Sequence, residues 1–306
     1  MKARLGCISC FVKQGLAAAR LSTSDVALQR KILDEILKRL QGLPLDASPA
    51  FLSNIVYATV REMTGVADPF EHAKRETNRR ALALLPELRR RIAASADPLY
   101  TAIQVALIGN VVDLGIGHAF DLERDVEAML ASDLTVDDYP AFRSAMESCR
   151  RLLYVCDNSG EIAFDQLLME RLRAHYEVVA SVKSGPIIND ATMKDAEEVG
   201  LTSVVRVIET GSNYIGVSWE HSSAEFIAAF RAADVVIAKG QGNFETLSDS
   251  VGEIFFLLKV KCGEVAGELG VAEGATVFLR NRGRAKRQES AERCPGGRRR
   301  EARPQA

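Results

Sequence analysis

Residues 152–158, LLYVCDN, decide the fold class of this chain, because they form a short apolar run that ends abruptly in polar residues and Gly160. Such a run is typical of a buried strand. Further strands are expected at 176–182, 203–209 and 234–240, with a closing strand at 276–280, and helices at 161–175, 191–200, 223–233 and 253–270. Strands that alternate with helices predict right-handed crossovers and an α/β fold with a Rossmann-like, mostly parallel, doubly wound sheet.

The chain before this strand predicts helices. Residues 31–40, KILDEILKRL, repeat apolar side chains at helical spacing, and the helix expected at 49–65 ends at Gly65. Pro86 predicts a kink or break in a later helix. We therefore expect a helical N-terminal region at 1–150, an α/β metal- and phosphate-binding domain at 151–279, and a basic, disordered tail at 280–306.

Charge and composition restrict the possible partners. The 306 residues carry a net charge of -2, but residues 280–306 hold ten Arg and Lys against three Glu, so the body is acidic and no specific nucleic acid is expected. No apolar run reaches about 18 residues, which argues against a membrane partner, and the N-terminus lacks a signal-peptide pattern. The six scattered cysteines fit reduced thiols, so we expect a cytoplasmic location.

Three polar clusters follow three of the expected strands. They are residues 157–161 (DNSGE), 183–190 (KSGPIIND) and 239–245 (KGQGNFE). The carboxyl ends of parallel strands share one edge of a sheet, so the clusters should converge there. Their carboxylates and amides suit Mg²⁺ or Mn²⁺, and their lysines suit phosphate oxygens. The backbone N–H groups of Gly160 and Gly242 could add an anion cradle.

Each cluster also has a simpler structural explanation. Asp157 and Asn158 could cap the helix that starts near Glu161, and Asn189 with Asp190 could cap the next one. Gly240 to Gly242 could form only a tight turn. Three coincident caps with two lysines at strand ends favour a functional site over capping alone.

The runs CDNSGEIAFD (156–165), KSGPIINDAT (183–192) and AKGQGNFETL (238–247) resemble the damage-control phosphatase family, formerly called domain of unknown function eighty-nine and including the acidic-residue-methyltransferase-like proteins. CISC (7–10), DPFEHAKRETN (68–78) and GNVVDLG (109–115) are similar to its prokaryotic, cysteine-containing subgroup. The resemblance covers nearly all of residues 1–279 in matching order.

This resemblance implies a divalent-metal-dependent phosphomonoesterase that hydrolyses small phosphorylated metabolites, such as sugar phosphates or damaged phosphometabolites. The cation would be Mn²⁺, Mg²⁺, Co²⁺ or Ni²⁺. By motif match, Asp157, Asn158 and Asp190 would be metal ligands and Lys239 would hold the phosphate, and these four form the expected catalytic set. Further expected substrate contacts are Gly160, Glu161, Asn189, Asn110 and Asp113.

Several roles stay open on sequence alone. The nucleophile could be water or a carboxylate such as Asp157, although Asn158-Ser159 departs from the D-x-D of aspartyl phosphatases. Glu161 could act as a general base, as a support for the metal ligands or only as a first-turn helix acid. Cys7 and Cys10 could pack in a core, bind a metal or form a redox pair.

Two other function classes compete. A nucleotide-binding or methyltransferase-type Rossmann protein is one, but Gly240-x-Gly242 lacks the third glycine of the dinucleotide fingerprint. A non-enzymatic binding module that uses the cysteines and the basic tail is the other, and its binding would depend strongly on salt.

Overall fold

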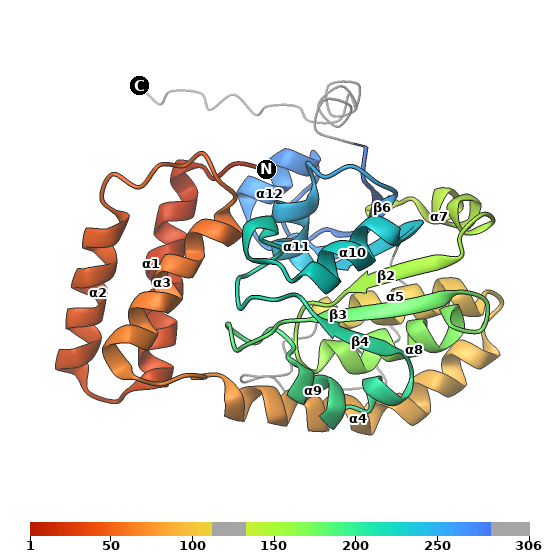
Figure 1. The fold of residues 1–306 in the computed structure, drawn as a ribbon, viewed down its shortest axis with the longest axis horizontal. Helices are drawn as coiled ribbons and strands as arrows, with labels where there is room; N and C mark the ends of the chain where they lie inside the picture. The colour runs from red at the N-terminus through yellow and green to blue at the C-terminus, as the bar shows by residue number, and fades with distance from the viewer. Residues whose placement is uncertain (112–132, 283–306) are drawn as a thin grey trace, which may run out of the picture.

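A computed structural model describes residues 1–111 and 133–282, and these form an α/β unit with a helical region beside it (Figure 1). The expected tail lies almost wholly outside the described residues. The strands are β1 (Val136–Asp137), β2 (Arg151–Val155), β3 (Glu177–Val182), β4 (Arg206–Glu209), β5 (Val235–Lys239), β6 (Ile254–Lys259) and β7 (Thr276–Arg280). The helices are α1 (Leu5–Ser22), α2 (Val26–Leu40), α3 (Pro49–Thr64), α4 (Glu71–Ala94), α5 (Pro98–Val111), α7 (Tyr139–Met146), α8 (Glu161–Leu172), α9 (Met193–Glu198), α10 (Ala224–Ala232), α11 (Gly240–Leu247) and α12 (Gly263–Leu269).

The sheet is mostly parallel and doubly wound, as the sequence predicts. In the described residues its order is β1-β7-β6-β5-β2-β3-β4, and only the β6–β7 pair is antiparallel. The chain leaves β2 through α8 to reach β3 and returns from β4 through α10 to β5, so the strand order reverses between β2 and β5. Ligands of such sheets bind beyond the carboxyl ends of the strands at this reversal.

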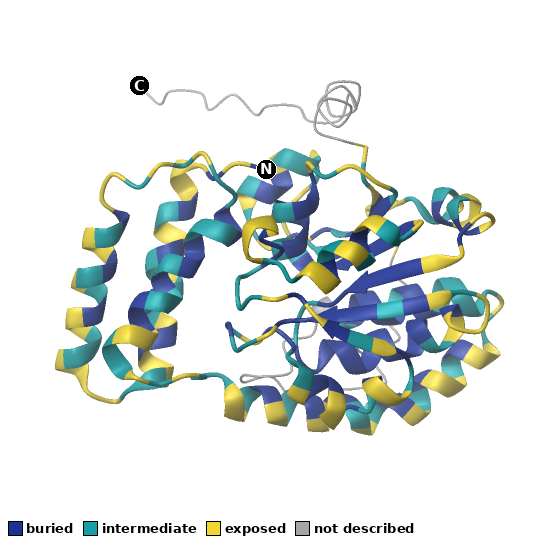
Figure 2. Cartoon of the chain, in the orientation of Figure 1, coloured by how far each residue is buried: buried dark blue, intermediate teal, exposed yellow. Residues whose placement is uncertain are grey.

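Two cores cover the faces of the sheet. Alternate strand residues such as Tyr154 and Ile237 pack towards α4, α5 and α8, while Val155 and Ala238 pack towards α10, α11 and α12. The strands are accordingly buried and the outer helix faces exposed (Figure 2). Burial on both sides explains the continuous apolar runs seen in the sequence.

The helix expected at 253–270 is wrong in its first half. Ile254–Lys259 is strand β6, and only Gly263–Leu269 is helical. A short apolar run that is buried on both faces has no periodicity that separates strand from helix. Pro86, where a kink or break was expected, does not break the helix, because α4 continues through that residue.

The helical region that packs apart from the sheet is smaller than the expected 1–150. Only α1, α2 and α3 form a separate core, around Phe11, Ile36 and Val56. In contrast, α4 and α5 pack on α8 and belong to the larger core of the sheet. The division of the chain at residue 150 therefore does not follow the packing.

Glu245 connects the two parts. It lies on α11, and its Oε2 atom accepts a hydrogen bond from the backbone N–H of Ala50 in the first turn of α3 at 2.7 Å. Its Oε1 atom accepts from Gln241 Nε2 at 2.9 Å. Asn54 of α3 adds a second connection, because its Oδ1 atom accepts from the backbone N–H of Ile215 at 3.1 Å.

Burial raises the pKa of Glu245 to about 7, although the Gln241 and Ala50 donors act to lower it. Between about pH 4.5 and pH 7 the folded protein thus keeps a proton that the unfolded chain has released, so the free energy of unfolding falls as pH rises through this window. We expect Glu245→Gln to make this fall shallower. Urea unfolding at pH 5, 6, 7 and 8 measures how steeply the free energy of unfolding falls, with Glu220→Gln on the surface as control. An unchanged pH slope in the Glu245 variant would contradict the assignment.

Candidate active site

Backbone hydrogen bonds join the loop after β2 to the loop after β3. The N–H of Ser159 donates to Asn189 O at 2.8 Å, and that of Ala191 donates to Asp157 O at 2.8 Å. Asn158 and Asp190 face each other in an isolated antiparallel bridge. The structure therefore brings together the three expected metal ligands from segments that are about thirty residues apart in sequence.

The joined loops form a buried acidic group. Burial, followed by the carboxylates of Glu161 and Asp190, raises the pKa of Asp157 well above its usual range. Burial also raises the pKa of Asp190 to about 6, although the Lys183 ammonium acts to lower it. Asp190 Oδ1 is buried and accepts no hydrogen bond among the described residues. Such crowded, desolvated carboxylate oxygens are stabilised by a cation.

The side-chain amide of Asn158 donates hydrogen bonds to this acidic group. Its Nδ2 atom donates to Asp157 Oδ2 at 2.7 Å and to Glu161 Oε2 at 3.0 Å. The carbonyl oxygen of the amide is thereby left as the atom that can coordinate a cation. The described residues contain no group of three or more His, Cys, Asp or Glu side chains arranged for a metal ion. The expected ligands Asp157, Asn158 and Asp190 are two carboxylates and one amide, so they do not require a group of three such side chains.

Gly240 makes room for Asp157. A Cβ atom on Gly240 would lie 1.9 Å from Asp157 Oδ2, and the glycine has a φ of +77°, which L side chains rarely adopt. Residues 240–242 are the first turn of α11 and not a separate tight turn, and Gly240 forms one wall around the Asp157 carboxylate.

Lys239, which the resemblance implies would hold the phosphate, is buried in the core. Its side chain is 0 % exposed. The ammonium donates to Glu161 Oε1 at 2.6 Å, to Asp165 Oδ1 at 2.5 Å and to Ala106 O at 2.9 Å. All three ammonium hydrogens are therefore used inside the protein, which argues against the expected phosphate contact. The position of Lys239 at the end of a strand does not reveal that its ammonium is buried, because the side chain turns inwards to α5 and α8.

The remaining expected contacts fall in different places. The Gly160 N–H, expected to cradle an anion, instead donates to Asn78 Oδ1 at 2.6 Å. Asn189 lines the cleft described next. Asn110 lies on α5 but its side chain is not described, and Asp113 lies outside the described residues. Glu161, 2 % exposed, lies between Asn158 and Lys239, so it supports the expected ligand Asn158 rather than facing solvent.

A cleft of about 300 Å³ opens over Asp157 and Asn158, between the carboxyl edge of the sheet and helices α1 and α3. Lys261, which follows β6, is exposed on its wall and forms no ion pair among the described residues. Its charge acts to lower the pKa of Asp157, which lines the same cleft. The sequence analysis missed Lys261 because it assigned 253–270 to one helix, which concealed a further strand end.

Cys7 and Cys10 also line this cleft, together with Cys262. Burial is the main cause that raises the pKa of both Cys7 and Cys10, so these thiols stay protonated near neutral pH.

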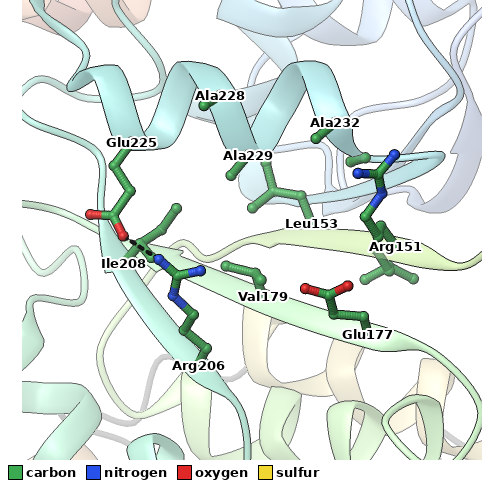
Figure 3. A pocket seen from close by; sticks show the side chains of 12 residues that line it. Arg151, Leu153, Glu177, Val179, Arg206, Ile208, Glu225, Ala228, Ala229 and Ala232 are labelled. Carbon is green, nitrogen blue, oxygen red and sulfur yellow. Dashed lines mark hydrogen bonds and ion pairs between the residues drawn. The ribbon is translucent and has the colours of Figure 1, made fainter.

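Another cavity, of about 280 Å³, lies between α10 and the amino-terminal halves of β2 and β3, with β4 at its side (Figure 3). Its floor is apolar, with Leu153 and Val179, and its rim holds the ion pair between Arg206 and Glu225 at 2.6 Å. The acidic loops lie at the opposite ends of these strands, so this cavity does not contribute to the same site.

The model of the damage-control phosphatase ARMT1-like domain matches residues 4–277. The chain belongs to this family. It is 37 % identical over 287 residues to a damage-control phosphatase, PH1575, of Pyrococcus horikoshii, which covers 92 % of the chain and 99 % of the relative. It is 34 % identical to a damage-control phosphatase of Archaeoglobus fulgidus, over 89 % of the chain and 96 % of the relative.

The fold agrees with a solved member of the family. A crystal structure of the DUF89 family protein from P. horikoshii superposes with a TM-score of 0.87 at 38 % identity, over 92 % of this chain and all of that one. Among residues 1–111 and 133–282, no helix is long and apolar enough to cross a membrane.

Lys239→Met should destabilise the protein by about 3–5 kcal/mol, because it leaves the carboxylates of Glu161 and Asp165 buried without their cation. The loss should be smaller at pH 5 than at pH 8, since burial raises the pKa of Asp165 to about 7 and the acid can then take up a proton. Urea unfolding at both pH values measures it. A loss below about 1 kcal/mol at pH 8 would show that the buried ion pairs are not as described.

Gly240→Ala should weaken divalent-cation binding at least about tenfold, because the new methyl group displaces the Asp157 carboxylate. Gly200→Ala is the matched control, since Gly200 has a similar φ of +79° but open space around its Cβ position. Isothermal titration calorimetry with Mn²⁺ compares the cation affinities of the two variants. Both variants should lose some stability through backbone strain, and equal cation affinities would refute the role of Gly240.

Proposed function

We propose that this chain is a divalent-metal-dependent phosphatase that hydrolyses small phosphorylated metabolites in the cleft above Asp157. The observation that carries the proposal is the pair of adjacent carboxylates, half-buried Asp157 and buried Asp190, in which Asp190 Oδ1 has no hydrogen-bond partner among the described residues. The family and the two phosphatases named above support the same reaction class.

The donor set fits a hard divalent cation such as Mn²⁺, Mg²⁺, Co²⁺ or Ni²⁺, held by Asp157, Asn158 and Asp190. A cation there supplies positive charge that neutralises the phosphoryl oxygens during transfer. Asp157 is enclosed by Gly240 and hydrogen-bonded to Asn158, so we assign it to cation binding and assign the attack on phosphorus to water.

We assign the phosphate contact to Lys261 instead of Lys239. Lys261 is exposed in the cleft that Asp157 also lines, whereas Lys239 donates all its hydrogens inside the core. Glu161 accepts from both Lys239 and Asn158, so it orients the amide of Asn158 and does not take up the proton of the attacking water. The cleft volume of about 300 Å³ suits a small phosphoester.

Chelation with EDTA should abolish hydrolysis of p-nitrophenyl phosphate.

Metal binding and phosphate binding can be separated by two substitutions. Asp190→Asn should raise the metal concentration needed for half-maximal rate, because an amide binds a hard dication more weakly than a carboxylate, and added Mn²⁺ should recover part of the rate. Lys261→Ala should lower kcat/KM about 10²-fold without rescue by metal.

Initial rates over a Mn²⁺ titration measure both effects, and Lys31→Ala, an exposed lysine of α2, serves as control. Full activity of the exhaustively chelated enzyme would reject the metal requirement. Rescue of Lys261→Ala by Mn²⁺, or wild-type turnover of that variant, would reject the phosphate contact.

A further inference from the structure

The run 68–78, DPFEHAKRETN, at the start of α4 takes part in none of the chemistry proposed above. Two of its side chains, Lys74 and Asn78, lie one turn apart on this helix and are only 5 % and 0 % exposed. Neither is among the described residues that line the cleft over Asp157. A buried polar side chain needs partners inside the protein, and the partners of Asn78 lie beside the two loops that carry the expected metal ligands.

The carbonyl oxygen of Asn78 holds the loop after β2. Asn78 Oδ1 accepts the backbone N–H of Gly160 at 2.6 Å, and Gly160 comes two residues after the expected ligand Asn158. This N–H lies at the start of α8, where the first donors of a helix have no acceptor within the helix. Gly160 also packs directly on α4, because a Cβ atom there would lie 2.9 Å from Thr77 Cβ. Contacts with α4 therefore fix the backbone position of this loop.

The amide nitrogen of the same side chain holds the loop after β3. Asn78 Nδ2 donates to Asp195 Oδ1 at 3.1 Å and to Glu198 Oε2 at 2.7 Å, both on α9. The second oxygen of Asp195 accepts from the backbone N–H and the hydroxyl of Thr192, at 2.9 Å and 2.6 Å, and so caps α9. Thr192 comes two residues after the expected ligand Asp190. A single side chain, that of Asp195, thus connects Asn78 with this loop.

Lys74 adds charge to the same network. Its ammonium lies 2.6 Å from Asp68 Oδ2 and 3.6 Å from Asp195 Oδ2. The carboxylate of Asp195 is buried, and the cation compensates a charge that the neutral amide of Asn78 cannot balance. Asp68, Lys74 and Asn78 of the run 68–78 therefore belong to one polar network around Asp195.

The amide of Asn78 meets two opposite demands at once. Gly160 presents a donor and Asp195 presents an acceptor, and one planar group serves both. A carboxylate at this position would accept from Gly160 but would repel Asp195. Because the two bonds share one rigid group, neither loop can shift relative to the other without breaking one of them.

We infer that Asn78 is a positioning residue that holds the two ligand loops at the separation a cation between Asp157 and Asp190 requires. The inference rests on the metal site of the proposed function. Asn78 contacts neither the cation nor the substrate and acts through Gly160 and Asp195. Side chains that orient metal ligands in this way typically change cation affinity about 10- to 100-fold when they are replaced.

Asn78→Asp should raise the dissociation constant for Mn²⁺ about 10- to 100-fold, because a carboxylate cannot donate to Asp195. Adding Asp195→Asn should recover about threefold or more, since the new amide then donates to the new carboxylate and one hydrogen bond is restored in the opposite direction. Isothermal titration calorimetry on the metal-free proteins measures the affinities, at a temperature at which thermal unfolding shows each variant to be folded. A role in stability alone would lower Tm and leave the Mn²⁺ affinity of the folded protein unchanged.

Asn54→Asp is the matched control. Asn54 is also a buried amide that joins two segments, but its partners are backbone groups of α3 and of Ile215, none of them in residues 157–161 or 183–192. This variant should lose stability and keep a dissociation constant for Mn²⁺ within about twofold of the wild type. Unchanged affinity in Asn78→Asp, equal losses in both variants, or no recovery in the double variant would overturn the inference.

Gly160→Ala tests the same contact should Asn78→Asp not fold. The new methyl group meets Thr77 and displaces the loop from α4, whereas Gly200→Ala, at a similar φ of +79°, places its methyl group in open space. Gly160→Ala should bind Mn²⁺ at least about tenfold more weakly than Gly200→Ala, and equal affinities would overturn the inference while leaving the proposed function intact. Absence of Mn²⁺ binding by the wild type would instead reject the proposed metal site, and this inference with it.

Discussion

The buried ammonium of Lys239 is the interaction on which the rest of the site depends. It joins the end of β5 to Glu161 and Asp165 on α8 and to the carbonyl of Ala106 on α5, with no solvent contact. Glu161 in turn accepts a hydrogen bond from Asn158. A charge that is costly to bury is thus stabilised by two carboxylates, and the geometry of the acidic loop is determined from inside the protein. The position of β5 next to β2 in the sheet makes this possible, because it places Lys239 beside the start of α8.

The second constraint comes from the helical region. Glu245 accepts the N–H of Ala50 and Asn54 accepts that of Ile215, so α3 is held over the carboxyl edge of the sheet. The cleft therefore has two unlike walls. Its sheet side provides the acidic loops and Lys261, which suit a cation and a phosphate, and its helical side provides neutral donors and apolar surface.

The sequence predicts those features that depend on local patterns. The alternation of apolar runs and helices gives the parallel sheet, and the polar residues after β2 and β3 give the convergence of Asp157, Asn158 and Asp190. It does not show whether a strand-end side chain turns outwards or inwards, so Lys239 was expected to hold the phosphate although it is buried in the core. It could not separate β6 from α12, because a doubly buried strand lacks periodicity, and Lys261 was missed for that reason. Contacts across more than fifty residues, such as Asn78 with Gly160, leave no local signal.

In the proposed site, Asp157, Asn158 and Asp190 hold the cation while Lys239 supports them from within the core. A crystal grown with Mn²⁺ and phosphate, with the metal located by its anomalous scattering, tests both parts at once. We expect an anomalous peak within about 2.0–2.6 Å of oxygen atoms of all three side chains, phosphate next to Lys261, and Lys239 still paired with Glu161 and Asp165. A peak at the cysteines of the cleft, or phosphate in contact with Lys239, would contradict it.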